Sequence, residues 1–514
     1  MPALDKLTEK ISGRALAVAH RQFEAAAISP VRLIRELGLE GQPCVLLDSA
    51  GGAPDLCRYS FLAWDPRLTL SFRGRRARLG GPGGPIEIGH NDPFALLREL
   101  LAGLAPEQAP SPSGLGLPLT GGAFGLLGYD AGRHIERLPE LAADDLGLPE
   151  LAFIFPRRLI AFDHHRGLAH LLFEDPLPGE LEAAQRLLRS LEGESGFRPG
   201  ADEALRERHA FSLSATTRSN MTQVSFQHMV RRAKEYILAG DIFQSNLSQR
   251  LEMPCRGESL ELYDALRTVN PSPFAGYLNL DGFEIISSSP ERLVQLEGRR
   301  VQTRPMAGTR RRGVDFTEDG SLAQELNLDP KERAEHIMLV DLERNDMGRV
   351  CDYGSVRVSE LMVNERYSHV IHIVSNVRGV LHHDRDAIDL LRAMFPGGTI
   401  TGCPKVRCME IIDELEPVRR GPYTGSFGYI GYGGGQTDCG PGHETGNMDM
   451  NIIIRTLVRL GDRLYAQAGA GIVADSDPAR EYRETLRKAE AMVRAVELAG
   501  RRAARPPGRE RALD

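Results

Sequence analysis

Two pairs of glutamates have the spacing that places both carboxylates on one face of a helix. Glu332 and Glu335 lie in DPKERAEHIMLVDLE, and Glu481 and Glu484 lie in DPAREYRETLRKAE. Each pair follows an Asp-Pro step, which suits a helix start. Four such carboxylates would suit Mg²⁺, which takes a few carboxylates, several waters and an anionic substrate group. Taken alone, each pair is more simply explained as a solvated helix face that forms ion pairs with neighbouring arginines.

Several glycine-rich or basic stretches could bind a small polyanion. They are MAGTRRRG (306–313), FPGGTITGCPKVR (395–407), Arg455 and AGAGIV (468–473). Glycines at strand ends expose backbone N–H groups, and a helix beginning at Pro404 would add its positive end. A tight turn is the simpler explanation of any single stretch. Pro404 precedes Lys405 and no GK[ST] is present, so we exclude a nucleoside-triphosphate loop.

Two residues could perform acid–base chemistry. Glu291 follows an apolar strand and Pro290, where a side chain can reach the lip of a site. His372 lies in an alternating apolar strand, where a hydrogen-bonded core histidine is the commoner outcome. No nucleophile elbow, Cys–His arrangement or dinucleotide fingerprint is present in the sequence. Covalent thiol chemistry is therefore not indicated.

The elements that must position these residues are mostly strands with helices between them. The pattern predicts a helix through 225–240 that stops at Gly240, and strands that include HVIHIVSNVRGVL and an unbroken MDMNIIIRTLV. No regular βαβ alternation is visible, so we expect an α+β fold with large antiparallel sheets packed together and helices outside. We expect an N-terminal region (1–190), a linker (191–222), a catalytic region (223–498), a disordered tail (499–514) and a mobile loop at 433–447.

Composition limits the class of protein. The chain has 514 residues, 41% of them hydrophobic, and a net charge of −7, as expected of a globular enzyme and not of a general nucleic-acid binder. A nucleic-acid contact through Arg310 to Arg312 and RGRRAR (73–78) would show steep salt dependence. Seven cysteines without a CxxC pair favour a reducing compartment, and no signal peptide or membrane span is expected. We therefore expect a cytoplasmic protein that has no membrane or nucleic-acid partner.

Together these stretches resemble the chorismate-utilising enzymes, in particular component I of anthranilate synthase and of aminodeoxychorismate synthase. The resemblance begins with LLDSA, RYSF and GGAFGLLGYD and is almost continuous from GDIFQSNLSQR to ETLRKAEAM. It implies a large α+β body of antiparallel sheets. It also implies Mg²⁺-dependent amination of chorismate, with ammonia supplied by a separate glutamine amidotransferase subunit (component II).

The resemblance also implies roles for individual residues. Glu335 and Glu484 match the principal Mg²⁺ ligands, with Glu332 and Glu481 nearby through water. Glu291 matches the general acid, and His372 and Thr399 match positions near the reacting ring. Residues expected to hold the carboxylates of chorismate are Gly308, Thr309, Tyr423, Arg455, Gly469, Ala470 and Gly471. LLDS and NPSPFA suggest a site for L-tryptophan formed by Ser49, Pro273, Phe274 and Ala275.

Two positions separate reactions within the family. Isochorismate and salicylate synthases carry a lysine that activates water where this chain has Gln244. Typical aminodeoxychorismate synthases carry a nucleophilic lysine where this chain has Ala307. Ammonia addition at carbon 2, giving anthranilate and pyruvate, is therefore favoured. NLSQR, GGTITGC and MDMNIIIRT nevertheless look more like aminodeoxychorismate synthases, which keeps that product as the alternative. A non-catalytic subunit that binds chorismate or tryptophan is the remaining alternative.

Overall fold

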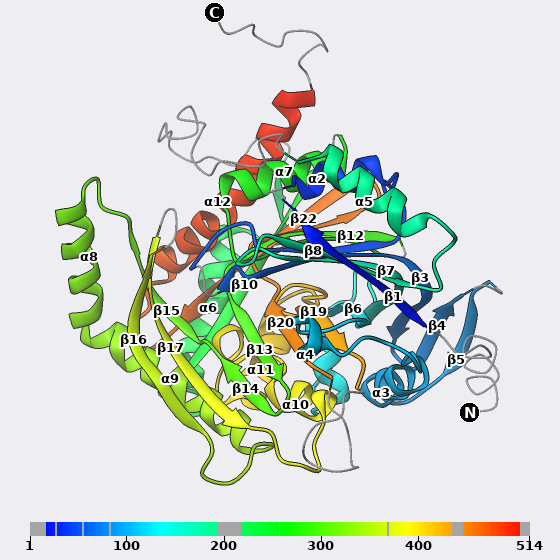
Figure 1. Ribbon diagram of the computed structural model, residues 1–514. Helices are drawn as coiled ribbons and strands as arrows, with labels where there is room; N and C mark the ends of the chain where they lie inside the picture. The colour runs from blue at the N-terminus through cyan, green and yellow to red at the C-terminus, as the bar shows by residue number, and fades with distance from the viewer. Residues whose placement is uncertain are drawn as a thin grey trace, which may run out of the picture.

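The computed structural model describes residues 17–25, 28–53, 56–81, 84–192, 217–255, 257–280, 282–366, 370–433 and 446–503. Figure 1 shows two groups of helices enclosing a large body of strands. The helices are α2 (Pro30–Glu36), α3 (Pro93–Gly103), α4 (Pro112–Leu115), α5 (Glu180–Ser190), α6 (Gln223–Leu238), α7 (Ser259–Val269), α8 (Phe316–Leu328), α9 (Pro330–Gly348), α10 (Ala387–Met394), α11 (Lys405–Leu415) and α12 (Pro478–Ala503), with 3₁₀ turns η2 (Tyr129–His134) and η4 (Gly398–Ile400).

The strands form one antiparallel network that can be followed as two sheets. The first sheet runs in the order β9 (Arg218–Ser219), β10 (Gln244–Pro254), β22 (Arg463–Ile472), β21 (Thr456–Leu460), β12 (Phe283–Ser289), β11 (Phe274–Leu280), β2 (Cys44–Asp48), β3 (Tyr59–Arg73), β7 (Leu151–Asp163), β8 (Leu168–Glu174) and β1 (Val18–Glu24). The short β18 (Gly402–Cys403) pairs with the start of β10.

The second sheet begins on the other halves of the long strands β3 and β7. It contains β5 (Ile86–Gly89), β4 (Arg76–Gly80), β6 (Gly122–Leu127), β19 (Ser426–Gly431), β20 (Met448–Ile452), β13 (Arg292–Glu297), β14 (Arg300–Thr303), β17 (Val370–Val380), β15 (Met306–Arg311) and β16 (Arg357–Arg366). The register of β3 against β7 shifts between Pro66 and Leu68, so both strands pass from one sheet to the other.

The three largest hydrophobic cores among the described residues follow from this arrangement. Phe61, Phe124 and Tyr429 belong to the core between the two sheets. A second core lies between the first sheet and helices α2, α5, α7 and α12, and a third between the second sheet and helices α3, α9 and α10. Neighbouring residues of one strand enter different cores, as Val45 and Leu46 do in β2. β2 is therefore buried on both faces, which explains its almost continuously apolar sequence, CVLLD.

The predicted fold class is confirmed, because every pairing between named strands among the described residues is antiparallel and helices cover the sheets. The helix stopped at Gly240 corresponds to α6, and Gly240 has a φ of +83°. None of the helices within the described ranges is long and apolar enough to cross a membrane. The predicted mobile loop at 433–447 and most of the predicted linker lie outside the described residues.

Two predictions about elements were wrong. MDMNIIIRTLV is not one strand: β20 ends at Ile452 and β21 begins at Thr456, because Arg455 has a φ of +54° and breaks the extended backbone. The predicted disordered tail begins too early, since α12 continues to Ala503. Residues 504–514 lie outside the described part of the chain.

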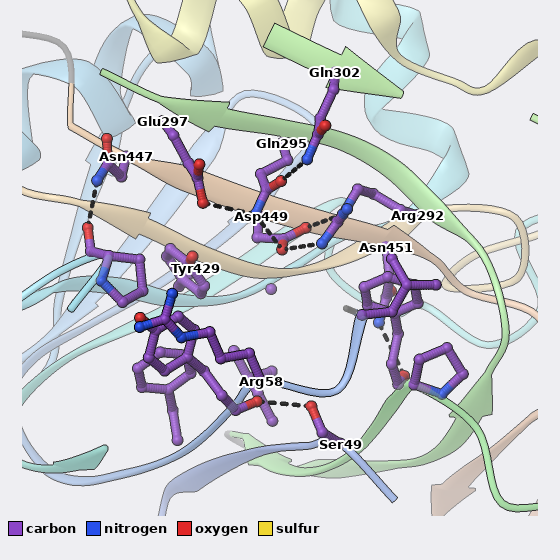
Figure 2. A pocket seen from close by; sticks show the side chains of 18 of the residues that line it. Ser49, Arg58, Arg292, Gln295, Glu297, Gln302, Tyr429, Asn447, Asp449 and Asn451 are labelled. Atoms are coloured by element: carbon purple, nitrogen blue, oxygen red, sulfur yellow. Dashed lines mark hydrogen bonds and ion pairs between the residues drawn. The ribbon is translucent and has the colours of Figure 1, made fainter. Parts of the chain in front are cut away.

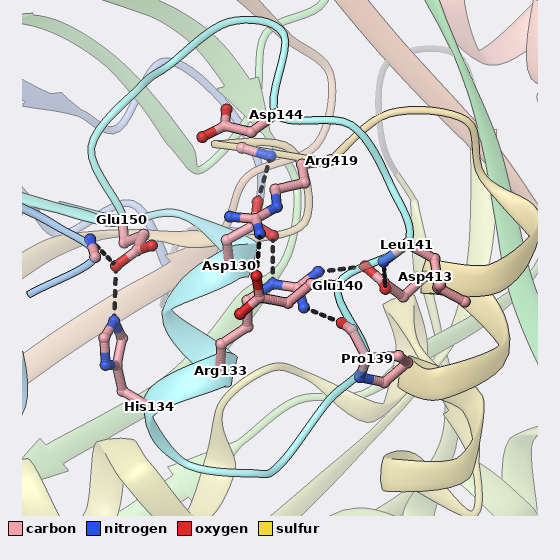
Figure 3. Close-up of polar contacts among 12 residues, drawn as sticks. Asp130, Arg133, His134, Pro139, Glu140, Leu141, Asp144, Glu150, Asp413 and Arg419 are labelled. Atoms are coloured by element: carbon pink, nitrogen blue, oxygen red, sulfur yellow. Dashed lines mark hydrogen bonds and ion pairs between the residues drawn. The ribbon is translucent and has the colours of Figure 1, made fainter.

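The N-terminal and catalytic regions contribute strands to the same sheets. β2 pairs with β11, and β6 pairs with β19. Figure 3 shows a further connection, in which Arg133 of η2 contacts Asp130 at 3.1 Å and also binds Asp413 of α11. The Asp413 carboxylate accepts a second hydrogen bond, from the backbone N–H of Leu141 at 2.7 Å. These contacts fix the segment between η2 and β7 onto α11, the helix that begins beside the candidate site.

Candidate active site

Glu291 is a buried carboxylic acid at the junction of β12 and β13. It is 6% exposed, and Thr399 of η4 donates a hydrogen bond to its Oε1 at 2.9 Å. Burial raises the pKa of Glu291 to about 7, against the opposing effects of the hydrogen bonds from Thr399 and the Met306 N–H and of the Lys488 charge. Such a carboxyl group can hold a proton near neutral pH and release it to a substrate, as a general acid must.

Arg455, Tyr423 and Gly469 form a compact group suited to an anion. The Gly469 N–H hydrogen-bonds the Tyr423 hydroxyl. A Cβ on Gly469 would lie 2.8 Å from that hydroxyl, so only glycine permits this approach. The Arg455 guanidinium donates to the carbonyl oxygen of Lys488 at 2.6 Å. Burial lowers the pKa of Arg455, but an arginine remains charged at physiological pH and retains further N–H donors for a carboxylate.

The four predicted metal ligands lie on α9 and α12, whose N-terminal turns begin at Pro330 and Pro478 as the sequence predicts. Gln244 donates to Glu335 Oε1 at 2.8 Å, Arg310 contacts Glu332 at 3.2 Å, and Lys488 contacts Glu484 at 2.8 Å. The charges of Lys331 and Lys488 act on both Glu335 and Glu481, one residue from each pair. Each of these carboxylates has oxygen lone pairs that these contacts do not use and that could bind a cation.

The pKa values of these glutamates follow from burial and charge. Burial raises the pKa of Glu335, and the neighbouring Glu332 raises it further. Burial also raises that of Glu484, but Lys488 and nearby arginines outweigh it and leave the pKa below its ordinary value. Hard carboxylate oxygens are the ligands that Mg²⁺ prefers, so the donor set fits this ion. Among the described residues, Asp352, His382 and His383 are the only group of three or more His, Cys, Asp or Glu whose ligand atoms lie within 4.8 Å of one another. The four glutamates do not form such a group. Any Mg²⁺ that they bind would therefore take its remaining ligands from water and substrate.

His372 lies on β17 opposite the predicted glycine turn of β15. Its Nδ1 is 2.9 Å from the carbonyl oxygen of Gly308 and 3.1 Å from the Thr309 hydroxyl. Gly308 has a φ of +62°, and the register of β15 shifts there. Burial lowers the pKa of His372 to about 4, so the ring is neutral at physiological pH. With Nδ1–H donated to a carbonyl oxygen, Nε2 is the acceptor nitrogen.

The structure brings the predicted catalytic, metal and substrate residues together around Lys488. The charge of this lysine acts on Glu291, Glu335, His372 and Glu484, and its Nζ donates to the carbonyl oxygen of Gly469 at 3.0 Å. Lys488 is not among the residues predicted from the sequence. Its i,i+4 spacing from Glu484 on one helix face was the available signal.

The arginines of TRPMAGTRRRG do not face this site as free cations. Arg310 contacts Glu325 and Asp329 at 3.1 Å in addition to Glu332. Arg304, Arg311 and Arg312 also form ion pairs with carboxylates, those of Glu360, Glu318 and Asp319 respectively. The basic stretch therefore anchors α8, α9 and β16, and only its Gly308–Thr309 turn lies beside His372.

A separate cavity of about 490 Å³ contains the predicted tryptophan residues (Figure 2). Ser49, Pro273, Phe274 and Ala275 all line it, from β2, β11 and the segments beside them. Arg292, the residue after Glu291, lies in its wall, where it makes a bidentate pair with Asp449 at 2.8 Å and stacks over Phe274. One backbone step therefore separates this cavity from Glu291.

Known proteins are similar to this chain in sequence and in fold. Residues 42–494 match the chorismate binding enzyme family. Anthranilate synthase component 1 of Thermus thermophilus is 48% identical over 387 residues, 74% of this chain and 79% of that protein. Aminodeoxychorismate synthase component 1 of Bacillus subtilis is 41% identical over 464 residues, 88% of this chain and 92% of that protein. The crystal structure of anthranilate synthase component I from Streptococcus pneumoniae has a TM-score of 0.70 and 33% identity, covering 86% of this chain and 93% of that one. The resemblance read from the sequence is confirmed, and the chain belongs to the chorismate binding enzymes.

Proposed function

We propose that this protein aminates chorismate with ammonia and forms anthranilate, pyruvate and water. The observation that carries the proposal is Glu291, a buried acid with a pKa near 7. The charge of Lys488 acts on Glu291 and on Glu484, and Arg455 donates a hydrogen bond to the Lys488 carbonyl oxygen. A diacid substrate with a poor hydroxyl leaving group needs these parts: groups that bind carboxylates and an acid that protonates the hydroxyl. The relatives carry names for two such aminations.

In this proposal each group of residues has a distinct role in binding or proton transfer. Arg455, the Tyr423 hydroxyl and the backbone from Gly469 to Gly471 hold one carboxylate, and the Gly308–Thr309 turn lies by the other. Glu335 and Glu484, with Glu332 and Glu481 through water, would hold Mg²⁺, which would neutralise the ring carboxylate. Glu291 donates its proton to the carbon-4 hydroxyl, which departs as water while ammonia adds at carbon 2 and its nitrogen loses one proton. The carbon-3 C–O bond then breaks and the carbon-2 proton is lost, which gives anthranilate, and the released enolpyruvate takes up a proton to become pyruvate. Thr399 orients Glu291, and neutral His372 lies beside the ring.

The product is proposed from what two positions lack. Ala307 follows Met306, whose N–H binds the Glu291 carboxylate, so position 307 lies close to the acid but offers only a methyl group. Gln244 binds Glu335 through its amide and cannot deprotonate water as a lysine can. Ala307 therefore disfavours a covalent intermediate, and Gln244 disfavours hydration. Direct addition of ammonia at carbon 2 is the reaction that remains favoured. Formation of 4-amino-4-deoxychorismate is the second candidate, because a relative with that activity in its name is 41% identical.

The ammonia is proposed to come from a glutamine amidotransferase subunit, since component 1 in the names of the relatives implies a second component. L-Tryptophan is proposed to bind the 490 Å³ cavity, where Arg292 connects the ligand site to Glu291. Calorimetric titration with tryptophan tests this second point. Heat of binding that is lost in S49W, which would fill the cavity, supports it, and no binding to the wild-type protein rejects it.

The test of the reaction is product analysis. The purified protein is incubated with chorismate, Mg²⁺ and ammonium, and anthranilate is followed by fluorescence. A parallel reaction with added aminodeoxychorismate lyase is assayed for 4-aminobenzoate. Anthranilate without lyase supports the proposal. Lyase-dependent 4-aminobenzoate assigns the second candidate, and chorismate binding without either product assigns a non-catalytic subunit.

A further inference from the structure

A second buried carboxyl group lies behind Glu291, and the proposed function does not use it. Glu343 belongs to α9, about two helical turns after Glu335. Its side chain is 4% exposed, and its carboxyl group accepts a hydrogen bond from the backbone N–H of Gly398 in η4. The next residue, Thr399, binds Glu291 at 2.9 Å. Glu343 and Glu291 are therefore connected through two successive residues of one short 3₁₀ turn.

The contacts of Glu343 favour its protonated form. Its Oε2 lies 3.5 Å from the Thr303 hydroxyl, but that hydroxyl already donates its single proton to the carbonyl oxygen of Leu293 at 2.8 Å. The contact with Thr303 therefore suits a carboxylic acid as the donor. Burial raises the pKa of Glu343, and the nearby Asp346 and Glu291 raise it further.

The charge of Lys405 lowers the pKa of Glu343 but does not offset burial and the neighbouring carboxyl groups. Lys405 of α11 forms an ion pair with Asp346 at 2.6 Å and donates to the Met394 carbonyl oxygen at 3.1 Å. Arg349, at the end of α9, acts on Asp346, and Lys488 of α12 acts on Glu291. The thiol of Cys403 on β18 is also within reach of the Asp346 charge. Glu343 and Asp346 thus share the buried Lys405, which contacts Asp346 directly, so Glu343 is the group of the two that retains a proton.

We infer that Glu343 is a positioning residue for Glu291. In its protonated form it holds Gly398 so that Thr399 meets the Glu291 carboxyl group, and its ionisation is opposed by any charge on Glu291. The pair therefore gives up its two protons over a wider pH interval than one carboxyl group would. Because one proton is then shared between the two groups, a fraction of Glu291 stays protonated to higher pH. This inference rests on the proposed role of Glu291 as general acid.

The test is the pH profile of kcat in E343Q. Glutamine can accept from Gly398 and donate to Thr303, so it preserves both contacts but cannot ionise. The fall of kcat at alkaline pH should move to lower pH by about one unit, because Glu291 no longer shares a proton with an ionisable neighbour. The matched control is E410Q on α11, whose carboxylate is partly exposed and pairs with Arg407. It should leave the profile in place. An unchanged profile in E343Q overturns the inference.

Infrared spectroscopy gives a readout that does not depend on turnover. At pH 7 the wild-type protein should show a C=O stretch from protonated Glu343 in addition to that of the partly protonated Glu291, and only the Glu343 band should be lost in E343Q. In E291Q, the corresponding Glu343 band should disappear at a lower pH than in the wild-type protein, which decides the question if E343Q does not fold. A wild-type protein that shows these bands but does not turn over chorismate would contradict only the proposed function. Absence of the band contradicts the inference alone.

Discussion

At the scale of the residue, a few side chains define the chemistry, and their types were readable from the sequence. The spacing of the glutamates and the Asp-Pro helix starts predicted two carboxylates on one face of α9 and of α12. The sequence did not predict which positive side chains neutralise these carboxylates. Lys488 connects the glutamates to Glu291, and Arg310 binds three carboxylates in place of a substrate. Such pairings depend on tertiary contacts that no local pattern encodes.

Replacement of Arg455 by alanine tests the carboxylate-binding group. The loss of hydrogen bonds to a charged partner is expected to cost about 1.5–3 kcal/mol, which corresponds to roughly 10- to 150-fold in kcat/KM, mainly through a higher KM. Steady-state kinetics with chorismate measures this. R459A, a partly buried position on β21 where Arg459 pairs with Glu284, is the control and should show the kinetics of the wild type. Near-normal kinetics in R455A would show that the substrate is held elsewhere.

Replacement of Glu484 by alanine tests the proposed metal site. Kinetics at several Mg²⁺ concentrations should show turnover reduced by more than about a hundredfold at limiting Mg²⁺, because a ligand of the ion is gone. E490A, which removes another α12 carboxylate that pairs with Arg494, should keep the Mg²⁺ dependence of the wild type. If E484A required no more Mg²⁺ than E490A, Glu484 would not be a ligand.

At the scale of the element, interruptions in the strands matter more than the strands themselves. The sequence predicted an unbroken strand through Arg455, because Ile, Thr and Val favour β structure. The positive φ of Arg455 ends that strand and places the guanidinium against α12, and the positive φ of Gly308 bends β15 near His372. Neither feature follows from propensity, since strained backbone of this kind is held by its surroundings.

The close packing of β22 against Tyr423 predicts the behaviour of G469A. The added Cβ would lie 2.3 Å from Asn246 Oδ1 and 2.8 Å from the Tyr423 hydroxyl, so these side chains must move. A displacement on the order of 1 Å in a substrate-binding group can reduce the rate about a hundredfold. The kcat/KM for chorismate should fall far more than the unfolding temperature. G500A on α12 meets no atom within 4 Å and is the control. Equal kinetics in the two variants would exclude tight packing around Gly469 as a requirement.

At the scale of the whole molecule, the candidate site takes its residues from both sheets. β10 and β22 belong to the first sheet, and β13, β15 and β17 belong to the second. The α+β class and the antiparallel sheets could be predicted from strand patterns alone. The pairing of β2 with β11 and of β6 with β19 could not, because such long-range registers are set by packing in the shared core.

The core between the sheets should therefore control global stability. Phe124 is fully buried there and contacts Phe61 and Tyr429, so F124A is expected to destabilise the protein by about 3–5 kcal/mol. Urea unfolding monitored by circular dichroism measures the change. F316A, at a 91% exposed position of α8, should change stability by less than about 0.5 kcal/mol. A similar unfolding curve for both variants would contradict the role assigned to this core.

The central claim is that Glu291 is the acid of a chorismate-aminating site. The most direct measurement is the kcat of E291Q with chorismate, Mg²⁺ and ammonium, compared with E252Q, a partly exposed β10 position paired with Arg463. Loss of the general acid is expected to reduce kcat by about 10²–10⁴-fold in E291Q, with E252Q close to the wild type. A wild-type enzyme that converts chorismate while E291Q retains its kcat would contradict the account.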